Sequence, residues 1–451
     1  MNQIVTLGRG VMTGSLVWPA LVVCLVAWHF RIGAWAEDAI DRLTPSKVAA
    51  VHAAVEEFAA TRSTRQRPGP FHEYRCNLHV HSAFSHDSRG TIEEIVAAAK
   101  RAGTDAILFT EHPADDYDFV ADGHAGFVDG VLLVPGAETK GVLVFPRDPV
   151  AEHGALEPQD LVRRVRARDG MSFLSHLEER MDWQLDSLTG CEIYNTHADA
   201  KEETRLFSLM KNPLWLLQVK VLLDRYPQEA LAALFDYPAE YLKRFDELCA
   251  HAPHTGISAN DAHQNVGLRI TLLEGGKVRV ASALDEELTI LDRALVAAFI
   301  PIPDDAEPGD LVFSLQLDPY QQSLRHVATH LLATELSRDG IQEALVAGRA
   351  FVAFDWIADA RGFEFVADDG DGRHEMGSRL PLDPALTLRG WAPLAGQWKV
   401  FNRGQLVHEA SGDEFSYRPC GVGNHRVELW LDVAGRSLPW VLSNPMYVVD
   451  R

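Results

Sequence analysis

Short apolar runs alternate with helix-like segments between about residue 72 and residue 280. The helix-like segments have clear end signals: Thr91 and Glu94 form a capping box, and Gly103 ends the helix that they begin. A second helix is expected at 160–169. This alternation predicts an α/β domain. The apolar runs expected to form strands are 74–80, 106–110, 131–134, 171–174, 190–194 and 255–259.

Two other regions have different patterns. Residues 201–250 carry apolar side chains at helical spacings without a strand signal, which predicts a helical insertion between strands. Its helices either complete the core or form a lid or a membrane-facing surface. Residues 386–449 contain short alternating runs separated by glycines, the pattern of a small β-sandwich.

A pair of histidines is expected on a later helix. Residues 321–336 predict a helix that places His326 and His330 four positions apart on one face, a spacing that suits a metal pair. No other ligand-type motif accompanies this pair in the sequence, so we interpret both as surface or core histidines. Residues 341–349 predict a further helix that ends near Gly348.

An apolar stretch lies near the N-terminus. Residues 11–28 contain no charge, and 18 residues is the lower limit for a helix that spans a bilayer. Arg9 precedes the stretch and acidic residues follow it, so an uncleaved anchor, which we favour, leaves the rest of the chain in the periplasmic or extracellular space. The Ala-Trp-Ala sequence at 34–36 suits signal cleavage, which would give a secreted protein instead. A buried helix of a soluble protein is the third interpretation.

The composition is that of a globular protein with two or three domains: 451 residues, 47% hydrophobic and 24% charged. The formal net charge of −22 argues against nucleic acid as a partner, because the sequence shows no basic stripe for phosphates. A small anionic substrate is compatible with this charge, since bound metals reverse the local sign. The five cysteines show no Cys-x-x-Cys spacing, so neither a disulfide framework nor a structural zinc site is indicated.

Metal-binding residue types follow the apolar runs. The first run ends in His79 and His81, whose imidazoles point to the same face of a strand, and Asp87 follows six residues later. One such pair is a weak signal, but later runs end in the same way, with His112, Glu138, His176, Asp261 and His263. Side chains at the carboxyl ends of barrel strands converge on one mouth. Imidazole and carboxylate ligands suit Zn, Mn or Fe, and eight are too many for one tetrahedral ion, which implies two or three divalent ions.

These motifs together resemble the PHP (polymerase and histidinol phosphatase) superfamily. His-Val-His with a trailing Asp, then Thr-Glu-His, Pro-Gly-Ala-Glu, Ser-His and Asp-Ala-His stand in the family's order, over roughly residues 74–280. The resemblance implies a distorted (β/α)7, TIM-like barrel in which a di- or trinuclear metal centre usually hydrolyses phosphoesters. The metal ligands that it implies are His79, His81, Asp87, His112, Glu138, His176, Asp261 and His263.

The resemblance also implies roles within the site. Glu138 and Asp261 would bridge the ions or accept protons, with a metal-bound water as nucleophile. Two positions depart from the family pattern and bear on the substrate class: Glu111 stands where Asp is common, and Leu177 where Pro is frequent. The residues expected around the ligands, or in contact with substrate, are Glu111, Glu192, Asn195 and His197.

We therefore divide the chain into four parts. These are an N-terminal anchor or signal segment (1–36), a helix at 37–61 with a linker (together 37–70), the PHP metallohydrolase domain (71–360, with its insertion at about 201–250) and a C-terminal β-sandwich-like domain (361–451). The anchor makes the membrane one expected partner, and the substrate is expected to be a small anionic ester.

Three functions fit this organisation. The first is a phosphatase or phosphodiesterase, which rests on the metal ligands and the family's usual chemistry. The second is a carboxylester, amide or carbamate hydrolase on the same centre, because the tail at 439–448 resembles the CehA/McbA-type branch, which includes such enzymes. The third is a non-catalytic binding protein stabilised by metal.

Overall fold

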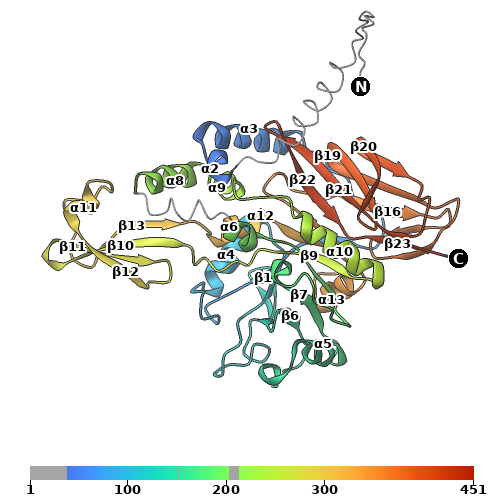
Figure 1. Ribbon diagram of the computed structural model, residues 1–451, viewed down its shortest axis with the longest axis horizontal. Helices are drawn as coiled ribbons and strands as arrows, with labels where there is room; N and C mark the ends of the chain where they lie inside the picture. The colour runs from blue at the N-terminus through green and yellow to red at the C-terminus, as the bar shows by residue number, and fades with distance from the viewer. Residues whose placement is uncertain (1–37, 151, 203–212) are drawn as a thin grey trace, which may run out of the picture.

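The protein has a mixed α/β architecture built on three sheets. Figure 1 shows a computed structural model, which describes residues 38–150, 152–202 and 213–451. Its sheets contain 14, five and four strands. The α/β expectation is therefore confirmed at the level of fold class.

Two groups of strands form the centre of the fold. In the first, β1 (His72–Val80), β2 (Ala106–Phe109) and β4 (Val131–Val134) pair in parallel. The second is the five-stranded sheet, in which β7, β8 and β9 are parallel. Its strands are β5 (Ala137–Thr139), β6 (Val142–Phe145), β7 (Met171–Leu174), β8 (Gly190–Asn195) and β9 (Thr255–Ala259). Every residue of β2, β4, β7, β8 and β9 is buried, as expected of strands covered on both faces.

The two groups meet at the carboxyl ends of their strands. Val80, at the end of β1, forms a parallel bridge with Ala262, just after β9. Glu111, just after β2, forms another with Ala137 in β5. Side chains that follow β1, β2 and β9 are consequently held close together.

Helices connect and cover these strands as predicted. α4 (Ile92–Ala102) begins at the capping box of Thr91 and Glu94 and ends at Gly103, whose left-handed φ of 76° suits glycine. α5 (Pro158–Ala167) packs against β6 and β7. The short strand β3 (Gly126–Val128) pairs with β4 at the edge of the largest sheet.

The N-terminal helix predicted at 37–61 is divided in two. α2 (Ala39–Arg42) ends before α3 (Pro45–Thr61), because Pro45 has no N–H to continue a helix and suits the first turn of the next one. The predicted anchor at 11–28 lies outside the described residues. Within the described residues, no helix has the length and apolar character needed to cross a bilayer.

The described residues in the region of the predicted insertion are mainly helical. Its helices are α6 (Thr196–Glu202), α8 (Pro213–Arg225), α9 (Pro227–Ala232) and α10 (Ala239–His251). Asp246 on α10 forms a buried ion pair with Arg426, at 2.8 Å, and Arg426 also pairs with Glu428 at 2.6 Å. α10 is therefore fixed to the C-terminal strands.

A four-stranded antiparallel sheet extends away from the rest of the molecule (Figure 1). It lies between β9 and α12, and no pattern in the sequence analysis predicted it. Its elements are β10 (Gly267–Leu273), β11 (Lys277–Ser282), β12 (Glu287–Asp292), α11 (Arg293–Ala297) and β13 (Leu311–Gln316). α8 packs onto its apolar face through Leu216 and Leu217.

The C-terminal strands continue the largest sheet. Its order runs β17-β16-β19-β21-β22-β15-β14-β1, so hydrogen bonds between strands cross the expected boundary at residue 360. β19 pairs with β16 along one half and with β21 along the other. The separate β-sandwich stays a prediction. The remaining elements are α12 (Tyr320–His326), β14 (Ala328–Ala333), α13 (Arg338–Val346), β15 (Ala350–Ala353), β16 (Glu364–Asp368), β17 (Arg373–Glu375), β18 (Arg379–Pro381), β19 (Thr387–Asn402), β20 (Gln405–Tyr417), β21 (Gly423–Val433), β22 (Arg436–Ser443) and β23 (Met446–Val449).

The helix predicted at 321–336 is wrong beyond His326. The chain there becomes the buried strand β14, because pairing with β1 and β15 outweighs the local helical pattern. His326 accepts or donates a hydrogen bond with the Tyr194 hydroxyl at 3.0 Å. His330 lies between Glu73 at 2.7 Å and Asp355 at 2.9 Å. Both are core histidines and do not form a metal pair.

We predict that the charge on His330 stabilises the fold and is lost at alkaline pH. Burial opposes this charge, but Asp355 and Glu73 raise the pKa of His330 from 6.5 to about 9. A pKa raised by folding gives stability that is complete below the unfolded value and lost as the pH rises through the folded value. Between pH 6.5 and pH 10, the free energy of unfolding in urea should fall by up to about 3 kcal/mol more in the wild type than in His330→Gln.

The control is His326→Gln. Burial lowers the pKa of His326 to about 3, so this side chain stays neutral across the same range and its replacement should leave the pH slope unchanged. An unchanged slope in His330→Gln would contradict the assignment.

Candidate metal centre

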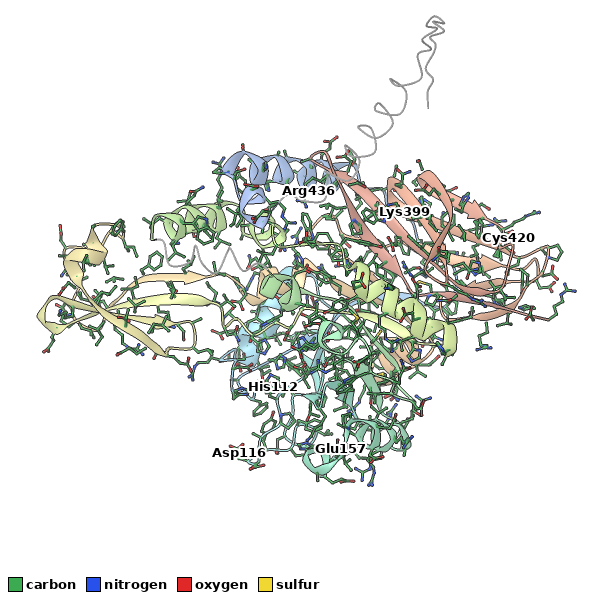
Figure 2. The ribbon with its side chains drawn as sticks, viewed as in Figure 1. His112, Asp116, Glu157, Lys399, Cys420 and Arg436 are labelled. Carbon is green, nitrogen blue, oxygen red and sulfur yellow. The ribbon has the colours of Figure 1, made fainter. Side chains whose placement is uncertain are left out.

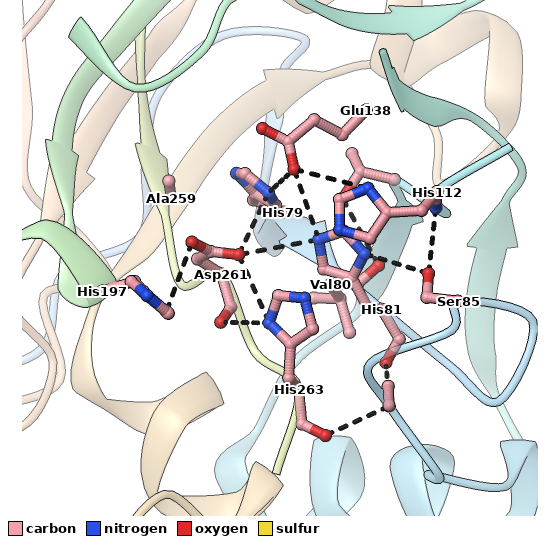
Figure 3. A network of polar contacts seen from close by, with 12 residues as sticks. His79, Val80, His81, Ser85, His112, Glu138, His197, Ala259, Asp261 and His263 are labelled. Carbon is pink, nitrogen blue, oxygen red and sulfur yellow. Dashed lines mark hydrogen bonds and ion pairs between the residues drawn. The ribbon is translucent and has the colours of Figure 1, made fainter. Parts of the chain in front are cut away.

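The eight predicted ligands lie together at the mouth formed by the central strands, and Figure 3 shows most of them. They are His79 in β1, His81 and Asp87 after β1, His112 after β2, Glu138 in β5, His176 after β7, and Asp261 and His263 after β9. Strand ends that adjoin in the fold explain this convergence of residues far apart in the sequence.

One group of ligand atoms comprises His79, His81, Glu138 and Asp261, all within 4.8 Å of one another. The Nε2 atom of His79 lies 3.3 Å from Glu138 Oε2 and 3.3 Å from Asp261 Oδ1. The Nε2 atom of His81 lies 3.8 Å and 3.6 Å from the same two oxygens. Two imidazoles and two carboxylates facing one point suit a divalent ion.

A second group comprises His81, Asp87, His112 and His263. Asp87 Oδ2 lies 3.4 Å from His112 Nε2 and 3.3 Å from His263 Nε2. The His81 and His263 rings stack with their centroids 3.9 Å apart. His81 belongs to both groups, so ions in the two positions would be neighbours.

A third group comprises His197, Asp261 and His263. His197 Nδ1 lies 3.7 Å from Asp261 Oδ2. His176 Nε2 approaches the same oxygen at 3.5 Å and Glu138 Oε1 at 3.2 Å. The second oxygen of Asp261 thus faces two further imidazoles, and His197, expected only around the ligands, adjoins them directly.

In four imidazoles, Nε2 points into the site while Nδ1 contacts a protein oxygen. His79 Nδ1 lies 2.7 Å from Glu192, and His176 Nδ1 lies 3.0 Å from Glu178. His81 Nδ1 is 3.1 Å from the Ser85 hydroxyl, and His263 Nδ1 is 3.0 Å from the Asp261 carbonyl oxygen. Partners of this kind fix the ring orientation of metal-ligating histidines.

Several buried atoms of the site make no hydrogen bond within the described structure. They are His81 Nε2, Asp87 Oδ1, Asp261 Oδ1 and His263 Nε2. Buried polar atoms are rarely left without a partner, because each then carries an uncompensated desolvation cost. All four belong to the ligand groups, so bound divalent ions would satisfy them. The residues present therefore fit a metal centre.

The pKa shifts within this site favour the binding of cations. Burial opposes a charge on His79, but Asp261 and Glu138 raise the pKa of its imidazole well above the usual value. Burial likewise disfavours ionisation of Glu138, yet His79 lowers the pKa of that carboxyl well below its usual value. Burial and His263 lower the pKa of His81 to about 3. Metal binding requires neutral imidazoles and ionised carboxylates, so an ion would replace the proton on His79.

Two of the predicted ligands have a left-handed backbone. The φ angles of His176 and Asp261 are 47° and 49°, which is uncommon for residues other than glycine. Glu192 accepts a hydrogen bond from the His176 backbone N–H at 2.8 Å, which holds that conformation. Backbone strain of this kind concentrates at functional sites.

The four residues expected around the ligands have distinct positions. Glu192 contacts His79, as described, and Asn195 donates to Glu192 at 3.2 Å. The Asn195 side-chain oxygen accepts backbone N–H groups at the start of α6. Glu111 contacts no ligand side chain directly but bonds to serines beside His81. His197 adjoins the third group.

The family comparison agrees with this geometry. Residues 77–219 match the model of the PHP domain. This segment is therefore similar to a PHP domain. The matched segment contains six of the eight predicted ligands, and the structure brings Asp261 and His263 to them from beyond its end.

The other comparisons add little to the PHP assignment. A solved structure of a two-domain protein from Bacteroides vulgatus, described as containing a predicted PHP-like metal-dependent phosphoesterase, is 15% identical and covers 85% of this chain and 98% of its own. Its TM-score of 0.35 supports no inference about fold or activity. No curated protein matches the sequence.

The structure adds residues to the PHP site that sequence reasoning did not assign. Glu178 holds His176, and the Tyr241 hydroxyl on α10 donates to Glu178. Ser85 holds His81. Glu178 stands two residues after a predicted ligand, which is a usable signal, whereas Tyr241 reaches the site only through the packing of α10.

We predict that divalent metal stabilises the folded protein. Zn²⁺ or Mn²⁺ added to chelator-treated protein at 100-fold excess over the dissociation constant should contribute about 2.7 kcal/mol, because only the folded state assembles the ligands. The thermal unfolding midpoint should therefore rise, and the rise should shrink in His263→Ala.

The matched control is His254→Ala, which removes a histidine just before β9, at the opposite end of that strand from His263. This variant should keep the full metal-induced rise. An equal rise in His263→Ala, or none in the wild type, would contradict the site.

Proposed function

We propose that this protein hydrolyses phosphoesters with a centre of two or three divalent metal ions. The observation that carries the proposal is the overlap of the ligand groups: His81, Asp261 and His263 each belong to two of the three groups. Shared ligands place ions a few ångströms apart, which is the arrangement used to clamp a phosphoryl group. The PHP domain match supports the same chemistry.

The donor set suits Zn, Mn or Fe, since it combines imidazoles with carboxylates. When bound, such ions lower the pKa of a shared water and neutralise charge that develops on the substrate. The residues proposed to hold the first ion are His79, Glu138 and Asp261, and those for the second are Asp87, His112 and His263. Nε2 of His81 lies within reach of both positions and would bind one of the two ions. His176 and His197 would complete a third position with Asp261.

Within this proposal, Asp261 and Glu138 orient water and accept protons. Burial opposes ionisation of Asp261, but His79 lowers the pKa of its carboxyl well below the usual value, so it is charged at neutral pH. Its two oxygens face different imidazoles, His79 on one side and His176 on the other. A carboxylate in this position is able to contact both an ion and an attacking water.

A carboxylester, amide or carbamate hydrolase would use the same groups. Its support is the resemblance of residues 439–448 to the CehA/McbA-type branch. A non-catalytic binding protein is less well supported, because seven of the eight predicted ligands fall within groups that could hold a metal ion, and His176 adjoins them. The two enzyme classes are separated by their substrates.

Architecture and location belong to the same proposal. We propose that the two central strand groups are the two sides of a distorted (β/α)7 barrel, a view supported by the bridges that join them. We also propose that residues 11–28 anchor the protein, with the catalytic domain outside the cytoplasm, on the sequence pattern alone.

The test is hydrolysis by the metal-loaded full chain. A phosphodiester and a phosphomonoester should turn over, and Asp261→Asn should lower kcat/KM on the order of 1,000-fold, about 4 kcal/mol, because it removes a shared ligand. Circular dichroism would verify that the variant is folded.

The matched control is Asp116→Asn, which neutralises an exposed carboxylate near the outer edge of the molecule (Figure 2). Its kcat/KM should equal that of the wild type. Turnover of a carboxylic ester alone would favour the second class, and full activity in Asp261→Asn would refute the proposed centre.

A further inference from the structure

A buried carboxylate lies behind the metal centre and is not itself among its ligands. Glu111, only 2% exposed, accepts hydrogen bonds from the Ser82 hydroxyl at 2.6 Å and the Ser85 hydroxyl at 2.7 Å. It also accepts the Ser82 backbone N–H at 3.0 Å. These three donors tie the loop after β1 to the end of β2.

Ser85 makes three hydrogen bonds with one hydroxyl. Its single proton is donated to Glu111, since an ionised carboxylate only accepts. Both of its lone pairs must then accept. One takes the His112 backbone N–H at 2.9 Å, and the other takes Nδ1 of His81 at 3.1 Å. Nδ1 of His81 is thereby required to carry a hydrogen.

These hydrogen bonds of Ser85 fix the tautomer of His81. With its hydrogen on Nδ1, a neutral imidazole presents a bare lone pair at Nε2, which is the form that binds metal. His81 Nε2 is buried, makes no hydrogen bond and faces the ligand groups. The direction of the hydrogen bonds from Ser85 therefore matches what the site requires.

We propose that Glu111, acting through Ser85, is a positioning residue that holds His81 in its metal-binding tautomer. This inference rests on the proposed metal centre and assigns to Glu111 and Ser85 a role in one part of it. The same hydroxyl holds the His112 backbone, and Asp87 follows on the same loop, so the effect falls mainly on the group of His81, Asp87, His112 and His263.

Only a carboxylate of this length serves the arrangement. All three groups that face Glu111 are donors, so the amide of a glutamine would turn a donor toward Ser85 or Ser82. If an amide N–H donated to Ser85, the serine O–H would have to donate a hydrogen bond to His81 Nδ1, and the ring hydrogen of His81 would then sit on Nε2. An aspartate is one methylene shorter and would not span both serines.

A second carboxylate, Glu192, holds a different histidine and does not depend on Glu111 or Ser85. Glu192 contacts His79 Nδ1 directly at 2.7 Å, without a serine between them. His79 belongs to the group with Glu138 and does not belong to the group with Asp87. Loss of the Glu111–Ser85 contact should therefore weaken one metal position more than the other.

The test is Zn²⁺ binding to the chelator-treated full chain, measured by competition with a chromophoric chelator and by metal content. Ser85→Ala and Glu111→Gln should each weaken one Zn²⁺ site by about 10- to 100-fold and weaken the remaining Zn²⁺ binding less. Because Glu111 acts through Ser85, the double variant should lose no more than the weaker-binding single variant.

The matched control is Ser172→Ala, which removes a buried serine hydroxyl on β7 that makes no hydrogen bond within the described structure. It should bind Zn²⁺ as the wild type does, and thermal unfolding of each metal-free variant would report any general loss of stability. Wild-type affinity in both single variants, or losses that multiply in the double variant, would overturn the inference.

The outcome separates this inference from the proposed reaction. A wild type that binds no Zn²⁺ would overturn both. Selective loss of one site in the two variants, in a protein that hydrolyses no phosphoester, would uphold the role of Glu111 and refute the reaction.

Discussion

The site buries several ligand atoms of histidines and carboxylates together without hydrogen-bond partners. The desolvation free energy of these atoms is therefore not offset by protein contacts. Nε2 of His81 and of His263 and Oδ1 of Asp261 lie in this state. The surrounding contacts hold these side chains in position without bonding to the buried atoms. Protein oxygens contact Nδ1 of His81 and of His263, and Asp261 has a left-handed backbone conformation. Bound divalent cations would offset this cost.

The fold brings the predicted ligands together, and residues around them fix their orientations. Parallel strands bring their carboxyl ends to one mouth, where β1 bridges to the chain after β9. α10 then reaches back to this mouth through Tyr241, which supports Glu178 and so His176. The same helix is fixed by the buried Asp246–Arg426 pair. The C-terminal strands are therefore linked to the metal centre mechanically, although they carry none of the predicted ligands.

Sequence patterns predicted the parts of this molecule that depend on local order. The strand ends, the α4 capping box and the ligand types could be read because each is a short motif with its own chemistry. The strand containing His330 could not be predicted, because it pairs with β1, whose residues lie more than 250 positions away, and this pairing outweighs the local helical spacing. The role of Ser85 was also hidden, because it follows from counting donors and acceptors around one hydroxyl in three dimensions.

A crystal structure with bound Mn²⁺ or Zn²⁺ and anomalous diffraction data would show directly whether divalent ions bind in the predicted ligand groups. The prediction is anomalous peaks within the group of His79, His81, Glu138 and Asp261 and within the group of His81, Asp87, His112 and His263, with Nε2 of His81 bound to one of the two ions. The absence of anomalous density from both positions, with His81 Nε2 bound to a water or a protein group instead, would contradict it.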